Sequence, residues 1–190
     1  MSSKIIIPIV IGLVVIVGGI FFLQSSSSTS EVGGAPSGGA PSGEREVSTQ
    51  QVSEKDLVPD LTFKDFNGND VSLRDFQGKP IIVNSWAAWC PFCIDELPDF
   101  AEVQKEFGDE IVIIAIDRAE SLALAKSYTD ELEVTDDILF LLDPKDTFYR
   151  AIFGFSMPET LFVDADGVVR DHKRGPMTAE EIRERLQKIL

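Results

Sequence analysis

The chain has 190 residues, and its 32 Asp and Glu residues outnumber its 17 Lys and Arg residues, which gives a formal net charge of −15. Such an acidic excess argues against binding to nucleic acid and against a surface that lies flat on anionic lipid. Two cysteines and one histidine are too few for a structural zinc site, which takes four ligands that are usually Cys or His.

Residues 1–23 are predicted to form a transmembrane anchor. The stretch 5–23 carries no charge, and as a helix it would span roughly 28 Å, about the thickness of the hydrocarbon core. Lys4 precedes it, so the positive-inside rule predicts a single-pass protein of the cell membrane with a cytoplasmic N-terminus and an extracytoplasmic remainder. A cleaved signal peptide is the alternative, but this apolar run is longer than a typical one and no Ala-x-Ala pattern follows it.

Residues 24–52 have the composition of a flexible linker. They are rich in Gly, Ser and Pro, and the motif Gly-Gly-Ala-Pro-Ser-Gly nearly repeats within 33–43. A chain of this kind spans roughly 30 Å on average. The remaining residues, 53–190, are enough for one domain with a hydrophobic core.

The domain is predicted to begin with a β-hairpin and to continue with alternating strands and helices. Residues 61–66 alternate, Asn67 and Gly68 supply turn chemistry, and 71–73 return as the second strand. The later elements are predicted as strand 81–85, helix 91–107 kinked or restarted at Pro98, strand 111–116, helix 121–131, strand 138–142, helix 147–152, a hairpin of 160–163 with 168–170, and a C-terminal helix capped at Thr178. This order predicts an α/β fold, a mixed sheet with helices on both faces.

The two cysteines lie where a strand meets a helix. Cys90 stands at the predicted helix start, where unpaired N–H groups and the helix dipole favour a thiolate, so it is the expected nucleophile. Cys93 lies one turn further on and can resolve a mixed disulfide formed on Cys90. Pro91 suits the first turn because its missing N–H would have no partner there. This spacing predicts a redox-active dithiol.

Three stretches resemble the thioredoxin superfamily, and within it the membrane-anchored TlpA/ResA/DsbE type of thiol–disulfide oxidoreductase. They are NSWAAWCPFC at 84–93, Glu96 followed by Pro98, and GFSMPETLFVDADG at 154–167. The Pro-Glu-Thr step looks most like the cytochrome c maturation branch. The resemblance, which covers about 58–190, implies a thioredoxin-like fold with an added N-terminal β-hairpin.

The resemblance also implies a substrate-binding surface. It implies a cis peptide bond before Pro158, where an ordinary trans proline opening a strand is the alternative, and a Met157 backbone that pairs with an extended substrate. The substrate-binding residues expected on this basis are Trp89, Pro91, Phe92, Met157, Pro158 and Glu159. Trp86 is expected beneath the active-site loop, and Phe63, Phe66, Phe140 and Phe162 are expected in the core.

Asn84 departs from thioredoxin, which carries a buried aspartate at the matching place. An amide cannot accept a proton, so Glu96, three residues after Cys93 on the helix, is the expected acid–base partner of the second thiol. A carboxylate that merely stabilises the helix N-terminus is the alternative. Glu159 could add negative potential that disfavours the thiolate.

The predicted activity is thiol–disulfide exchange by a tethered dithiol, with Cys90, Cys93 and Glu96 as catalytic residues. No metal and no cofactor beyond the Cys90–Cys93 disulfide is expected. Protein thiols and disulfides are the predicted partners, apocytochrome c among them, with a membrane thiol–disulfide reductase as electron donor. The alternatives are a disulfide donor and a copper carrier in which a distant His172 joins the two thiolates.

A peroxidase and a docking module are further alternatives. A peroxidase of the peroxiredoxin kind would be expected to have Thr three residues before its reactive cysteine, and this chain has Ala87 there. A docking module would not need two thiols.

Overall fold

The computed structural model describes residues 56–190. The predicted anchor 1–23, the linker 24–52 and the domain boundary at residue 53 lie outside these residues. No helix within 56–190 combines the length and the apolar character needed to cross a membrane.

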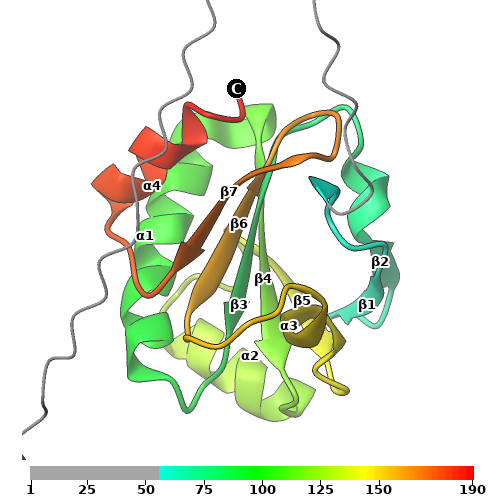
Figure 1. The fold of residues 1–190 in the computed structure, drawn as a ribbon. Coiled ribbons are helices and arrows are strands. Elements are labelled where there is room, and N and C mark those ends of the chain that lie inside the picture. Colours follow the sequence, from blue (N-terminus) through cyan, green and yellow to red (C-terminus); the bar gives the residue numbers. More distant parts are fainter. Residues whose placement is uncertain (1–55) are drawn as a thin grey trace, which may run out of the picture. The chain divides into compact units, whose positions relative to one another are not determined.

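Seven strands form one mixed sheet in the order β2-β1-β5-β4-β3-β6-β7 (Figure 1). Strands β3, β4 and β5 run parallel, whereas β6, β7 and the β1–β2 hairpin add in antiparallel fashion. The strands are β1 Thr62–Asp65, β2 Asp70–Ser72, β3 Ile81–Trp86, β4 Val112–Arg118, β5 Leu139–Asp143, β6 Glu159–Val163 and β7 Val169–Arg174.

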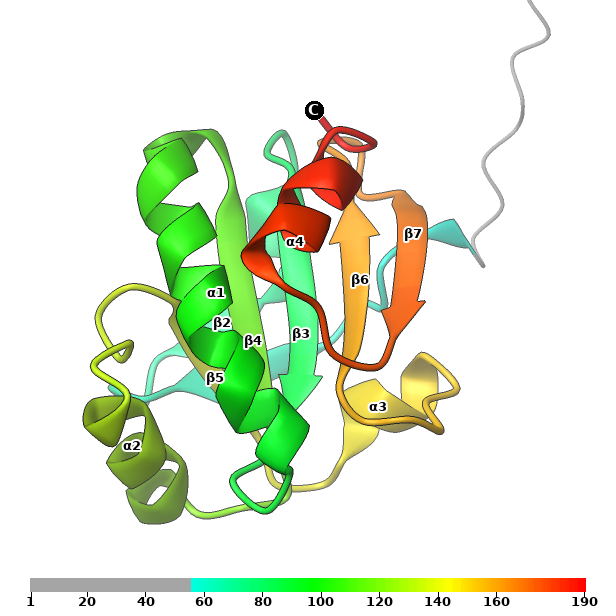
Figure 2. The same cartoon turned by 90° about the vertical axis from the view of Figure 1, so that its left-hand side faces the viewer.

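Helices cover both faces of the sheet, as predicted. The α-helices are α1 Pro91–Phe107, α2 Leu122–Glu131, α3 Thr147–Ala151 and α4 Ala179–Leu186, and two 3₁₀ turns, Leu73–Phe76 and Gly108–Glu110, connect other elements. Helices α1 and α4 lie on one face and α3 on the other (Figures 1 and 2). The α/β prediction, the N-terminal hairpin and the order of the elements are confirmed.

The hydrophobic core divides into two clusters, one on each face of the sheet. Phe100 and Leu97 of α1 and Ile182 of α4 belong to the first cluster, and Phe148 of α3 belongs to the second. Of the four phenylalanines expected in the core, Phe63, Phe140 and Phe162 are buried, whereas Phe66 is half-buried and stacks on Phe140 with ring centroids 5.3 Å apart.

We expect the substitution Phe100→Ala to lower the free energy of unfolding by about 3–5 kcal/mol, because it removes a fully buried ring between α1 and the sheet. Urea unfolding of the full chain measures this change. The exposed Phe92 on the same helix supplies the control, and a Phe92→Ala variant as destabilised as Phe100→Ala would contradict the packing argument.

Several predicted element boundaries are wrong. Helix α1 has the predicted bounds and runs through the exposed Pro98, so of the kink and the restart predicted there, the restart does not occur. Strand β7 reaches Arg174 rather than residue 170, because it pairs along the whole of β6. Helix α4 ends at Leu186, before the C-terminus, while its predicted cap is confirmed by the Thr178 hydroxyl, which accepts from Glu181 N.

The fold brings four segment ends together at one edge of the sheet. The carboxyl ends of the parallel strands β3, β4 and β5 meet there, and β6 begins beside them, since Ser85 pairs with Glu159 and Trp86 with Asp117. The loops that follow the strands therefore meet the start of α1 at this edge. Such an edge is where α/β sheets carry their sites.

Candidate active site

Cys90 and Cys93 form a disulfide at the start of α1, with their Cα atoms 5.3 Å apart. Cys90 is the N-cap residue, and its sulfur accepts a hydrogen bond from Cys93 N at 3.3 Å. Cys93 has no exposed surface, whereas Cys90 retains 4%. An incoming sulfur can therefore reach only Cys90, as the sequence predicts for the nucleophile.

Glu96 is buried beneath the dithiol on the same helix. Its Oε1 accepts from Asn84 Nδ2 at 2.8 Å, and its Oε2 accepts from Met177 N at 3.1 Å. Burial raises the pKa of the Glu96 carboxyl to about 8, although the two hydrogen bonds oppose the shift. A carboxyl group of this kind can hold or release a proton near neutral pH. Its burial argues against a role confined to the helix N-terminus.

Two further carboxyl groups, which the sequence analysis missed, support the active-site loop. Glu120 Oε2 accepts from Ala88 N at 2.7 Å, two residues before Cys90. Asp117, fully buried at the end of β4, accepts from Glu120 N at 3.1 Å. Burial, together with the neighbouring Glu120 carboxyl, raises the pKa of Asp117 to about 8. The sequence feature that could have indicated these two residues is the segment Asp-Arg-Ala-Glu, directly after an apolar run.

Trp89 directly precedes Cys90 and is 61% exposed, and Phe92, between the two cysteines, is 60% exposed. Pro91, which also lies between the cysteines, is exposed too. The Arg118 guanidinium lies 5.9 Å from the centroid of the Trp89 ring and 3.5 Å from that of Tyr149. Trp86, by contrast, is fully buried at the end of β3, as expected. The rings beside Cys90 are thus free to contact a docked protein.

The loop before β6 supplies the other side of the site. The peptide bond between Met157 and Pro158 is cis, which confirms that implication of the resemblance. Met157 is half-buried and Pro158 is buried. In the same loop Phe153 and Phe155 are 85% and 76% exposed, and the sequence analysis did not single them out. The sequence feature that could have indicated them is the pair of phenylalanines on either side of Gly154, shortly before Pro158.

Glu159 has no exposed surface, so it lies behind the loop rather than on a surface that a substrate contacts. Its expected role in substrate binding stays a prediction. The sequence analysis considered His172 only as a distant copper ligand. The structure instead places His172 Nε2 2.7 Å from Glu159 Oε2. The histidine that the copper alternative requires is therefore engaged elsewhere.

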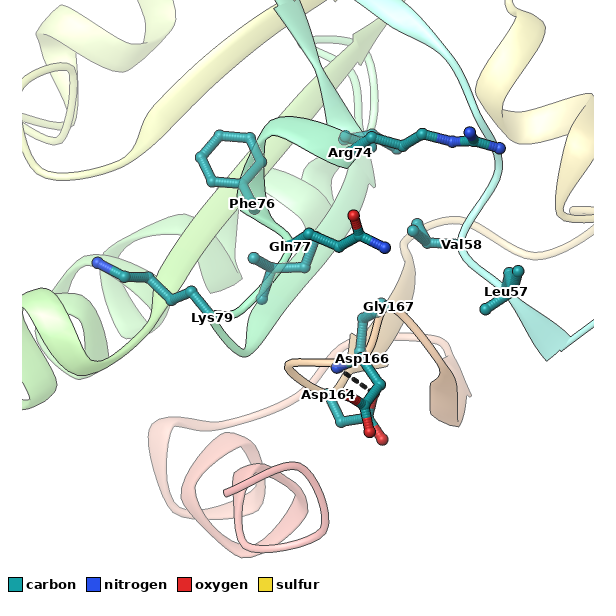
Figure 3. Close-up of a pocket in the computed structure, with 12 residues that line it drawn as sticks. Leu57, Val58, Arg74, Phe76, Gln77, Lys79, Asp164, Asp166 and Gly167 are labelled. Carbon is teal, nitrogen blue, oxygen red and sulfur yellow. Dashed lines mark hydrogen bonds between the residues drawn. The ribbon is translucent and has the colours of Figure 1, made fainter. Parts of the chain in front are cut away.

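A cavity of about 170 Å³ lies at the other end of the sheet (Figure 3). Residues 74–79 border one side of it and the turn at 164–167 the other. Ile81, at the start of β3, and Val163, at the end of β6, also line it. No residue of the dithiol loop or of the cis-proline loop contributes, so this cavity is separate from the candidate active site.

The Redoxin family matches residues 53–190, the whole of the predicted domain. The chain belongs to this family. It is 30% identical over 138 residues to the thioredoxin-like protein YneN of Bacillus subtilis, with 71% of this chain and 79% of YneN covered. It is 31% identical over 137 residues to the thiol:disulfide interchange protein DsbE of Allochromatium vinosum, with 70% and 73% covered.

A solved structure has the same fold. DsbF from Mycobacterium tuberculosis superposes with a TM-score of 0.65 at 23% identity, covering 73% of this chain and all of DsbF. This Redoxin protein therefore has the thioredoxin-like fold and belongs with the ResA and DsbE thiol–disulfide oxidoreductases. Its Cys90–Cys93 disulfide is the group that such an enzyme exchanges. The roles of Glu96 and of the substrate-binding residues stay predictions.

Proposed function

We propose that this thiol–disulfide oxidoreductase works outside the cytoplasm, tethered to the cell membrane by residues 1–23, and reduces disulfides in other proteins. The uncharged stretch 5–23 and the linker 24–52 support the tether. A membrane thiol–disulfide reductase is the proposed electron donor, because a dithiol outside the cytoplasm has to be reduced again after each turnover.

The observation that carries the reducing direction is the set of carboxyl groups around the dithiol. Glu96 is buried one turn after Cys93, and Glu120, backed by the buried Asp117, binds the loop just before Cys90. Carboxyl groups with a pKa of about 8 are mostly neutral at pH 7, so Glu96 and Asp117 supply no positive charge that would stabilise the Cys90 thiolate, and their ionisation at higher pH disfavours it. A thiolate without such stabilisation leaves the reduced form less stable. DsbA is a strong oxidant because its reduced form is stabilised, so this acidic setting supports the opposite tendency.

Arg118, a cation beside the active-site loop, does not offset this effect. Arg118 lies over the Trp89 ring, but its guanidinium forms two 2.8 Å hydrogen bonds with the Asp146 carboxylate. Its positive charge is therefore largely compensated by Asp146. This cation therefore adds little stabilisation to a thiolate at Cys90.

Apocytochrome c, through the cysteines that later hold haem, is the proposed substrate. The support is the resemblance of Pro158-Glu159-Thr160 to the cytochrome c maturation branch. The exposed rings of Trp89 and Phe92 suit a protein substrate of this kind, because large apolar side chains in water beside a reactive group mark docking surfaces.

We expect the Cys90–Cys93 couple to have a reduction potential near that of thioredoxin, about −270 mV. Equilibration of the full chain with dithiothreitol or glutathione buffers of known potential, followed by thiol trapping, gives the value. A potential near about −120 mV would reject the reducing direction and identify a disulfide donor instead.

A further inference from the structure

One buried carboxylate connects the cis-proline loop to strand β7. Glu159 is fully buried, and its Oε1 accepts hydrogen bonds from the backbone N–H groups of Phe155 at 2.7 Å and Ser156 at 2.8 Å. Two N–H groups of the loop thus bond to the same carboxylate oxygen. The conformation of residues 153–157, called here the docking loop, therefore depends on where this carboxylate is held.

The other oxygen of Glu159 faces two residues of β7. Its Oε2 lies 2.7 Å from His172 Nε2 and 3.6 Å from Arg174 Nε. A carboxylate oxygen accepts hydrogen bonds, so this contact is a hydrogen bond in the tautomer of His172 that carries its hydrogen on Nε2. A buried carboxylate needs such partners, since an uncompensated charge in the interior is strongly unfavourable.

Arg174 also contacts the docking loop directly. Its guanidinium lies 4.7 Å from the centroid of the Phe155 ring, although that side chain is 76% exposed. The next residue, Gly175, donates its N–H to the carbonyl of Pro158 at 2.8 Å. The end of β7 thus contacts the docking loop through a side chain, through the Glu159 carboxylate and through the backbone.

The docking loop also packs closely against Tyr149 of α3. Gly154 lies against Tyr149, and a Cβ atom at this position would be only 2.4 Å from the tyrosine ring. Phe153 adopts a positive φ of 54°, which is uncommon for a bulky residue. These constraints leave both phenylalanine rings of the loop exposed to solvent, as expected for a surface that contacts another protein.

We propose that His172 and Arg174 are positioning residues which, through the buried Glu159 carboxylate, hold the docking loop in the conformation that binds a protein disulfide. The proposal rests on the proposed function, since it concerns how that same site recognises proteins. It assigns Phe155 and the Met157 backbone to substrate binding and leaves thiol chemistry to Cys90. Small disulfides, which need only the thiol, are therefore insensitive to this network.

The test compares a protein disulfide with a small one, using the purified full chain. Insulin, with dithiothreitol as the recharging thiol, is the protein probe, and 5,5′-dithiobis(2-nitrobenzoic acid) is the small one. We expect His172→Leu and Arg174→Gln each to raise KM for insulin about tenfold, the loss expected from removing a partner of a charged group. The value of kcat, the rate with the small disulfide and the reduction potential remain at wild-type values.

Two further variants separate positioning from a general effect on the fold. His172→Gln retains an N–H donor at about the distance of Nε2, so we expect it to restore KM for insulin. Arg170→Gln removes a cation from the same face of β7, but Arg170 pairs with Asp164, so KM stays at the wild-type value. The Arg174 side chain is 38% exposed, so its replacement should leave the fold intact. If His172→Leu fails to fold, Arg174→Gln therefore tests the inference.

Two results would overturn the inference. One is an unchanged KM for insulin in both His172→Leu and Arg174→Gln. The other is an equal loss of rate with insulin and with the small disulfide, which would indicate a purely structural role. A wild-type chain that does not reduce insulin at all would overturn the proposed function, and this inference with it.

Discussion

The substitution Cys90→Ser is expected to reduce thiol–disulfide exchange to the uncatalysed background, whereas Cys93→Ser is expected to stop turnover at a mixed disulfide. The structure explains the difference, because Cys93 has no exposed surface and Cys90, the N-cap residue of α1, keeps a small exposed area. Without Cys93, no thiol one turn away can release the partner bound at Cys90.

Mass spectrometry of each variant after mixing with a disulfide substrate measures the trapped species. A mixed disulfide should form on Cys93→Ser and be absent from Cys90→Ser. The double variant Cys90→Ser with Cys93→Ser gives the blank. Equal trapping by the two single variants would show that Cys93 is accessible to substrate and would reverse the assigned roles.

Glu96→Gln is expected to slow the step that releases the substrate from Cys90 by about a hundredfold at pH 7, within the usual range for losing an acid–base group. The carboxyl of Glu96 has a pKa raised to about 8 by burial, so the wild-type rate should change with pH around that value. The glutamine variant should lack this change, because an amide does not titrate in this range.

Stopped-flow measurement of the release rate between about pH 6 and pH 10 tests this expectation. The control is Asp95→Asn, which removes an exposed carboxylate from the adjacent position of α1. A Glu96→Gln variant that retained the wild-type pH profile would show that another group transfers the proton. Asp117, whose pKa is also raised to about 8, would then be the next residue to replace.

The Glu96 carboxyl group also makes the free energy of unfolding depend on pH. The folded-state pKa of Glu96, about 8, exceeds the ordinary value of 4.5 for a glutamate, so between these two pH values the folded chain keeps a proton that the unfolded chain has lost. The contribution of Glu96 to stability is therefore complete below about pH 4.5 and falls as pH rises to about 8, by on the order of 4 kcal/mol. Urea unfolding of wild type and Glu96→Gln across this range should show the difference.

The order of the elements could be predicted from the sequence because local patterns specify them. The apolar run that opens β4 is continuous, as in a strand covered on both faces, and Cys90 with Pro91 marks the start of α1. Strand β7 was predicted too short because its later residues have no such local pattern. Its sequence, Val-Arg-Asp-His-Lys-Arg, is mostly polar, and only pairing with β6 makes it a strand.

The residues of the candidate site also fall into two groups, those that a local pattern indicates and those that only the fold brings together. By itself the sequence determined the dithiol, the nucleophile and the acid three residues later, because Cys90, Cys93 and Glu96 lie on one helix whose periodicity relates them. Only the tertiary structure decided that Glu120 supports the dithiol loop and that His172 and Arg174 hold Glu159. Those contacts join residues on different strands and loops, whose proximity depends on the order and register of the sheet and leaves no periodic signal in the chain.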